Sequence, residues 1–312
     1  MGELLALLNA VFMGTANVCA RKGMNEGKID KFSGLFLTLV VNNILNVVFL
    51  LTFGFGQGKV TFNLPGLAYN ILAGISNSFT GRWTLFCSIA YIGASRAGIL
   101  KIVTPLFAIL GGVLLLNEKP SSQAWLGILI ILSGVAFISI ETSKTKGQLA
   151  VTAASASETN TKKSNKSSLP VKGIILGLLA SLFFAGGNIC RKLGVLYIPN
   201  PFLSVTLGSF AALISAGLIL LACGKGKELL IALKNINKSY LLAGIFTSLA
   251  LYCLFGSLQL IPISITSSIG ASEALFTILA SRVLLGNKEV LNWRVVTGAL
   301  IVVSGVILLI LM

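Results

Sequence analysis

The sequence predicts an all-α polytopic membrane protein, with ten transmembrane helices arranged as two inverted five-helix repeats. Of its 312 residues, 55% are hydrophobic and only 11% are charged, and the mean hydropathy is +0.93. These values lie far outside the composition of water-soluble chains. The apolar residues form continuous runs rather than the alternating pattern of a barrel strand, so each run is expected to satisfy its backbone hydrogen bonds within a helix.

Ten apolar runs are long enough to cross ~30 Å of hydrocarbon. They lie at residues 3–22, 34–56, 65–91, 95–116, 122–140, 173–192, 201–223, 239–260, 263–286 and 293–312. Polar residues interrupt the third run, but its length favours one tilted span. Residues 142–172 are rich in Ser, Thr and Lys and are predicted to form a flexible linker. The linker separates a first repeat, 1–141, from a second repeat, 173–312.

Three segments of the first half return in the same order in the second half. Phe12-x4-Asn17-x-Cys19-x3-Gly23 returns as Phe183-x4-Asn188-x-Cys190-x3-Gly194, residues 106–110 return as 275–279, and the Gly-x6-Gly segment 127–134 returns as 298–305. Because each half holds an odd number of spans, the second copy must insert upside down. Inverted repeats of this kind are typical of transporters that alternate access to a site near the middle of the membrane.

At this point the chain resembles the EamA-type repeat of the drug/metabolite transporter superfamily. The resemblance is carried by the five spans per half, by residues 106–110 running into the Leu-Asn-Glu-Lys motif at 116–119, and by the closing Gly-x6-Gly helix. It covers both halves and excludes only the linker. It implies a small-molecule transporter with a central cavity among the first, third, fourth, sixth, eighth and ninth helices. The second copy departs from the first, because Glu273 and Ala274 stand where Thr104 and Pro105 stand.

We expect a secondary active transporter or exporter in the plasma membrane, moving a small polar metabolite by alternating access. The chain contains no histidine and only nine acidic residues, so no catalytic residue, metal site or cofactor is predicted. It also lacks the GxxxxGK[ST] phosphate loop, which argues against direct ATP drive. The alternatives are a membrane sensor or scaffold that has the transporter fold and, with least support, an intramembrane enzyme.

The +15 net charge does not indicate nucleic-acid binding, because the basic residues punctuate hydrophobic runs instead of forming one basic face. The expected partners are the lipid bilayer, a small-molecule substrate and, as coupling ion, protons. Most lysines and arginines fall in the odd-numbered connections, which by the positive-inside rule places both termini outside and the linker in the cytoplasm. The family resemblance implies the opposite orientation.

Charged residues within the predicted helices are the main candidates for the site. A charge at the centre of a spanning helix costs about 2.5–3.5 kcal/mol, so it needs a partner or a wet cavity. Arg82 and Lys101 are predicted to make the cavity electropositive, since Glu273 is the only deep acid. We therefore expect an anionic or zwitterionic substrate. Four further residues are predicted to line the cavity: Asn17, Asn188, Trp83 and Tyr252.

Glu273 is the candidate coupling residue. It lies about ten residues into a polar helix, on a stripe that has helical spacing and is expected to face the interior: Thr266, Gly270, Glu273, Thr277 and Ala280. Two interpretations remain open. Glu273 is either a structural ion-pair partner of Arg82 or Lys101, or a group that exchanges a proton during transport.

Overall fold

The computed structural model describes residues 1–26, 31–54, 63–92, 97, 100–101, 103–155, 171–224, 226, 234, 238–285 and 293–311. Every regular element assigned in these residues is a helix. The first repeat contains α1 (Gly2–Glu26), α2 (Lys31–Phe49), α3 (Leu64–Ala73), α4 (Arg82–Ile92), α6 (Val103–Leu115) and α7 (Ser122–Ser155). Two π-helical segments, η1 (Leu50–Gly54) and η2 (Gly74–Gly81), extend α2 and join α3 to α4. The second repeat contains α8 (Val171–Tyr197), α9 (Pro201–Ala222), α11 (Lys238–Leu260), α12 (Ile263–Gly270), α13 (Glu273–Leu285) and α14 (Trp293–Ile310).

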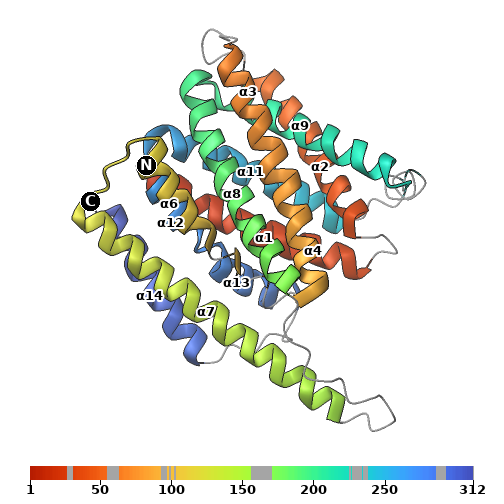
Figure 1. Cartoon of the computed structure of the whole chain (residues 1–312), viewed down its shortest axis with the longest axis vertical. Helices are drawn as coiled ribbons and strands as arrows, with labels where there is room; N and C mark the ends of the chain where they lie inside the picture. Colours follow the sequence, from red (N-terminus) through yellow and green to blue (C-terminus); the bar gives the residue numbers. More distant parts are fainter. Residues whose placement is uncertain are drawn as a thin grey trace.

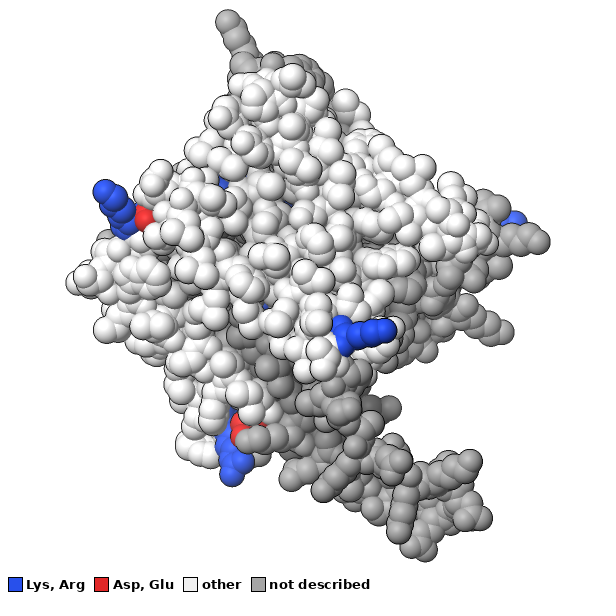
Figure 2. All heavy atoms as spheres, viewed as in Figure 1, with Lys and Arg blue, Asp and Glu red and all other residues white. Residues whose placement is uncertain are grey.

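Helical segments occupy all ten predicted positions. Among the described residues, six helices are long and apolar enough to cross a membrane, and three shorter apolar helices accompany them. Large hydrophobic side chains are exposed along most helices, and the face drawn in Figure 2 carries charged side chains at only a few places. These features indicate a multi-pass membrane protein. The exact number of crossings stays a prediction.

The two repeats interlock. The first helix of the first repeat, α1, packs against α11, α12 and α13 of the second repeat. In the equivalent arrangement, α8 packs against α3, α4 and α6 of the first repeat. In Figure 1, α8 runs through the middle of the molecule beside α4. The core between these helices is therefore shared by both repeats, and any site there is built from both.

The last helices of the two repeats, α7 and α14, lie side by side along one edge of the molecule (Figure 1). Their glycines mark the contact. A Cβ atom at Gly127 would meet Leu309, whereas one at Gly298 would meet Ile138. The start of α7 thus lies near the end of α14, so the two helices are antiparallel. This is the relation that inverted repeats require.

Three helices differ from their expected form. The helix expected at 122–140 extends as α7 to Ser155, into the segment expected as a linker, where helix formers (lysine, glutamine, leucine and alanine) recur between residues 144 and 154. Residues 156–170 lie outside the described residues. The third helical segment is continuous from α3 to α4, but its centre, η2, is π-helical. Single π-helical turns are frequent at functional sites.

The ninth helical segment is not one continuous helix. It divides into α12 and α13 at Ala271 and Ser272, so Glu273 begins a helix instead of lying within one. Ser272 Oγ donates to the carbonyl oxygen of Ile269 at 2.6 Å, and the backbone N–H groups of Ser272 and Leu275 bond three residues back. A serine side chain that bonds to nearby carbonyl groups competes with the α-helical ladder. The expected continuous stripe of residues 266–280 is therefore broken where Glu273 lies.

The backbones of η2 and α9 approach each other closely at Gly74 and Gly208. A Cβ atom added at Gly74 would overlap the carbonyl oxygen of Gly208. Gly74→Ala is expected to lower the free energy of unfolding by about 1–3 kcal/mol, because the backbones must move apart. Gly186→Ala is the matched control: no atom lies within 4 Å of its added Cβ atom, so the higher helix propensity of alanine should leave stability equal or higher. Thermal unfolding in detergent measures both variants, and a Gly74→Ala protein as stable as wild type would contradict the assigned helix contact.

Candidate functional site

A polar network joins the two repeats around Glu273, the first residue of α13. Asn17 on α1 donates from Nδ2 to Glu273 Oε1 at 2.6 Å, and Lys101 Nζ forms an ion pair with the same oxygen at 3.1 Å. The Lys101 ammonium also lies 5.5 Å from the ring centroid of Phe184 on α8. The side chains of Lys101 and Glu273 are 38% and 22% exposed, so the pair is partly accessible to a solute.

The break between α12 and α13 explains how an acid is held at this depth. Glu273 lies in the first turn of α13, where the partial positive charge of the helix end stabilises a carboxylate. Of the two interpretations of Glu273, the structure contains the ion pair with Lys101. Exchange of a proton at Glu273 stays a prediction.

Arg82 begins α4, directly after the π-helical segment η2. Its guanidinium is within electrostatic range of the Glu273 carboxylate. No hydrogen bond joins Arg82 to another described residue, unlike Lys101. The structure therefore places Asn17 and Lys101 in contact with Glu273 and Arg82 within electrostatic range of it, and a role of these residues in substrate binding stays a prediction.

Asn188, the counterpart of Asn17, has different partners. Its Oδ1 accepts from Asn77 Nδ2 at 2.9 Å and from the guanidinium of Arg191 at 3.1 Å. Arg191 also donates to Ser78 Oγ at 3.2 Å, and it is within electrostatic range of Arg82. The two asparagines therefore occupy equivalent turns but unequal surroundings, one beside an acid and the other beside a base.

The rings of Trp83 and Tyr252 pack against apolar and aromatic side chains. Trp83 packs against an apolar cluster formed by α2, η2 and α9, with its ring 5.8 Å from that of Phe79. Tyr252 on α11 packs on the rings of Phe49 and Phe202 at 5.3 and 5.2 Å.

Arg191 was not among the deep charges predicted from the sequence, because it stands at the end of the predicted span 173–192. The structure continues α8 to Tyr197 and leaves Arg191 only 5% exposed. A signal was present in the sequence: basic pairs stand at 21–22 and 191–192, at nearly equivalent positions of the two repeats. A charge pair retained in both copies of an inverted duplication is not explained by the positive-inside rule, which favours only one orientation.

A second polar network, formed by Glu118 and Lys192 and called the clamp below, holds the connection between α11 and α12. The Glu118 carboxylate accepts three hydrogen bonds, from the backbone N–H groups of Ile263 and Ser264 and from Ser264 Oγ. Lys192 donates to the carbonyl oxygens of Leu258 and Ile261 and is within electrostatic range of Glu118. An acid at a helix start and a base at a helix end both complement the helix dipole.

The Leu-Asn-Glu-Lys motif at 116–119 is shaped for this clamp. Asn117 has a φ of 54°, a left-handed conformation that asparagine tolerates, and it turns the chain after α6. This turn directs Glu118 back toward the start of α12. Gly112 leaves room for the carboxylate, because its added Cβ atom would lie 2.7 Å from Glu118 Oε2.

Glu118→Gln is expected to lower the free energy of unfolding by about 1–2 kcal/mol, because an amide keeps the shape but loses the charge and one acceptor oxygen. Thermal unfolding of the purified protein measures this loss. Glu3→Gln is the matched control, since Glu3 pairs only with the exposed N-terminal amine among the interactions described. Equal unfolding temperatures for Glu118→Ala and wild type would contradict the clamp.

Two interlocked helical repeats with charged side chains at their interface are typical of membrane transporters. The chain belongs to the EamA-like transporter family, whose model matches residues 1–140 and 171–311. An uncharacterized transporter in the cobO 3′ region of Sinorhizobium sp is 30% identical over 140 residues, which cover 44% of this chain and 96% of that protein.

Solute carrier family 35 member B1 of Xenopus laevis is 27% identical over 143 residues, which cover 43% of this chain and 42% of that protein. The match thus spans less than half of the frog protein. A crystal structure of another protein superposes with a TM-score of 0.72 at 13% identity, covering 98% of this chain and 96% of that one. This last similarity concerns the fold alone.

Proposed function

We propose that the protein is a secondary active transporter or exporter of the plasma membrane that moves a small anionic or zwitterionic metabolite by alternating access. One observation carries the proposal: Lys101, Asn17 and Glu273 meet between the two repeats, with Arg82 within electrostatic range. A cluster of this kind at the interface of two repeats can serve as a binding site. Movement of one repeat against the other can then expose this site to either side of the membrane.

The charges of the cluster support an anionic group on the substrate. Lys101 is neutralised by Glu273, which leaves the positive charge of Arg82 for a carboxylate or phosphate. Protons are the proposed coupling ion, because Glu273 is the acid of the cluster. A substrate anion that binds to Arg82 and Lys101 would compete with Glu273 for the lysine, which would couple substrate binding to the acid of the cluster.

The test is transport by the purified full-length chain in proteoliposomes. A panel of anionic, zwitterionic, neutral and cationic metabolites is applied by solid-supported membrane electrophysiology, with and without a pH gradient. We expect currents with anionic or zwitterionic compounds that grow with the gradient, and none in protein-free vesicles. Transport of cations alone would overturn the substrate class. Specific binding without transport would support a sensor or scaffold instead.

A further inference from the structure

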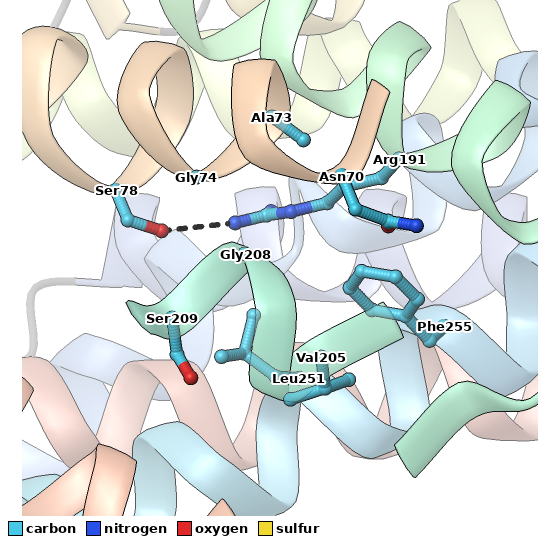
Figure 3. Close-up of a pocket in the computed structure, with 10 residues that line it drawn as sticks. All are labelled: Asn70, Ala73, Gly74, Ser78, Arg191, Val205, Gly208, Ser209, Leu251 and Phe255. Atoms are coloured by element: carbon cyan, nitrogen blue, oxygen red, sulfur yellow. Dashed lines mark hydrogen bonds between the residues drawn. The ribbon is translucent and has the colours of Figure 1, made fainter. Parts of the chain in front are cut away.

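A small cavity of about 10 Å³ lies beside Arg191, enclosed by α3, η2, α8, α9 and α11 (Figure 3). It has room for about one water molecule. Figure 3 shows the side chain of Arg191 extending along the cavity toward η2, where its guanidinium donates to Ser78 Oγ. Apart from this guanidinium and a few hydroxyl and amide groups, the walls are apolar, and the Phe255 ring centroid lies 6.0 Å from the guanidinium carbon.

Arg191 is a buried charge without an acidic partner among the described residues. Its hydrogen-bond acceptors, Asn188 and Ser78, are neutral. Arg82 is within electrostatic range, and its positive charge acts against that of Arg191. A buried charge that is not neutralised destabilises a protein, and charges retained inside membrane proteins mark ligand or ion pathways. The cavity beside Arg191 thus has the charge and hydroxyl groups of an anion site.

The wider charge balance points the same way. Among the described residues, Lys101 is paired with Glu273, Arg82 is within electrostatic range of both Glu273 and Arg191, and Lys192 is bonded to helix-end carbonyl groups near Glu118. Two positive charges therefore remain after the Lys101–Glu273 pair is formed. A single carboxylate on the substrate would leave one of them unneutralised in a low-dielectric interior.

We propose that Arg191, with Ser78, forms a second anion subsite, and that the substrate is an organic dianion such as a phosphate monoester or a dicarboxylate. The inference rests on the proposed function, which places the first anionic group at Arg82 and Lys101. Arginine suits the second because its planar guanidinium binds carboxylate and phosphate oxygens in pairs. In the present conformation the cavity admits only a water-sized group, so η2 and α9 separate when the subsite is loaded.

The experiment measures thermal unfolding of the full-length protein in detergent with inorganic phosphate, succinate, acetate or chloride at equal ionic strength and pH 8. Wild type is expected to gain more stability from the two dianions than from the two monoanions. Arg191→Met should unfold at a higher temperature than wild type without ligand, because an unneutralised buried charge is removed. It should bind phosphate and succinate about 10- to 100-fold more weakly.

Two further variants keep the test decisive. Arg282→Met is the matched control, because Arg282 is exposed near the end of α13 and should change neither result. Ser78→Ala retains the charge and removes one hydrogen-bond partner of Arg191. Ser78→Ala should weaken dianion binding about 2- to 10-fold and leave acetate binding unchanged. It therefore tests the same subsite if Arg191→Met does not fold.

The outcomes separate the inference from the proposed function. A structural arginine is indicated if Arg191→Met lowers the unfolding temperature without ligand and still prefers dianions. Equal stabilisation of wild type by chloride and phosphate indicates a site for small anions in general. That result would also overturn the proposal that the substrate is a dianion. If acetate no longer stabilises Arg82→Ala but still stabilises Arg191→Met, the first anion site is supported. The proposed transport of anions is then retained, whatever the result for dianions. No response of wild type to any anion overturns both.

Discussion

The Glu273→Gln protein is expected to lose transport driven by a pH gradient while retaining part of its substrate exchange at equal pH. Glutamine cannot bind and release a proton in this pH range, so a transport cycle that requires a change of protonation stops. The amide oxygen can still accept from Asn17 Nδ2 and Lys101 Nζ, which hold the carboxylate in the structure. Binding and folding should therefore survive the substitution better than coupling does.

The measurement compares pH-driven currents and counterflow at equal pH in the same proteoliposomes. Glu141→Gln is the matched control, because Glu141 forms its ion pair with Arg294 between α7 and α14, away from the Glu273 network. Driven transport should fall to background only in Glu273→Gln. Unchanged pH-driven transport would remove Glu273 from the coupling mechanism.

A double substitution separates coupling from a structural ion pair. If Glu273 serves only to neutralise Lys101, Glu273→Gln leaves a lysine without its partner and both modes of transport are lost. Lys101→Met combined with Glu273→Gln would then restore stability, because no charge of the pair remains. If Glu273 carries the proton, the double variant stays unable to use a pH gradient.

Arg82→Ala is expected to reduce transport of the anionic substrate about 100-fold, because the first anionic group loses the charge that neutralises it. Arg82 forms no hydrogen bond with another described residue, and its electrostatic attraction to Glu273 is opposed by repulsion from Arg191. Its removal should therefore leave insertion and unfolding temperature close to wild type. The loss is one of function and not of folding.

Initial rates of uptake at several substrate concentrations measure this loss, together with the amount of inserted protein. Arg82→Lys should retain part of the activity, because the charge remains but the paired hydrogen bonds of a guanidinium do not. Arg282→Ala, at an exposed position of α13, should transport as wild type does. An Arg82→Ala protein that inserts normally and transports at the wild-type rate would exclude Arg82 from substrate binding.

Part of the candidate site could be predicted because the cost of burying a charge is visible in a sequence. Arg82, Lys101 and Glu273 lie inside apolar runs, so each charge requires an oppositely charged partner or contact with water. Asn17 was predicted from its recurrence as Asn188. Trp83 and Tyr252 could not be placed in the same way, because aromatic side chains gain free energy in any apolar cluster and their sequence positions do not select one.

The sequence by itself determined the positions of the helices, the duplication and the family, because hydrophobic length and repetition are properties of the chain alone. Only the tertiary structure decided where the ninth helical segment breaks. The Ser272 hydroxyl competes with backbone N–H groups for a helix carbonyl oxygen, and whether it does so depends on its neighbours. It also decided that Arg191 is buried and that Glu118 caps α12. Burial and capping join segments more than 100 residues apart in the chain, and packing between the repeats is what brings such segments into contact.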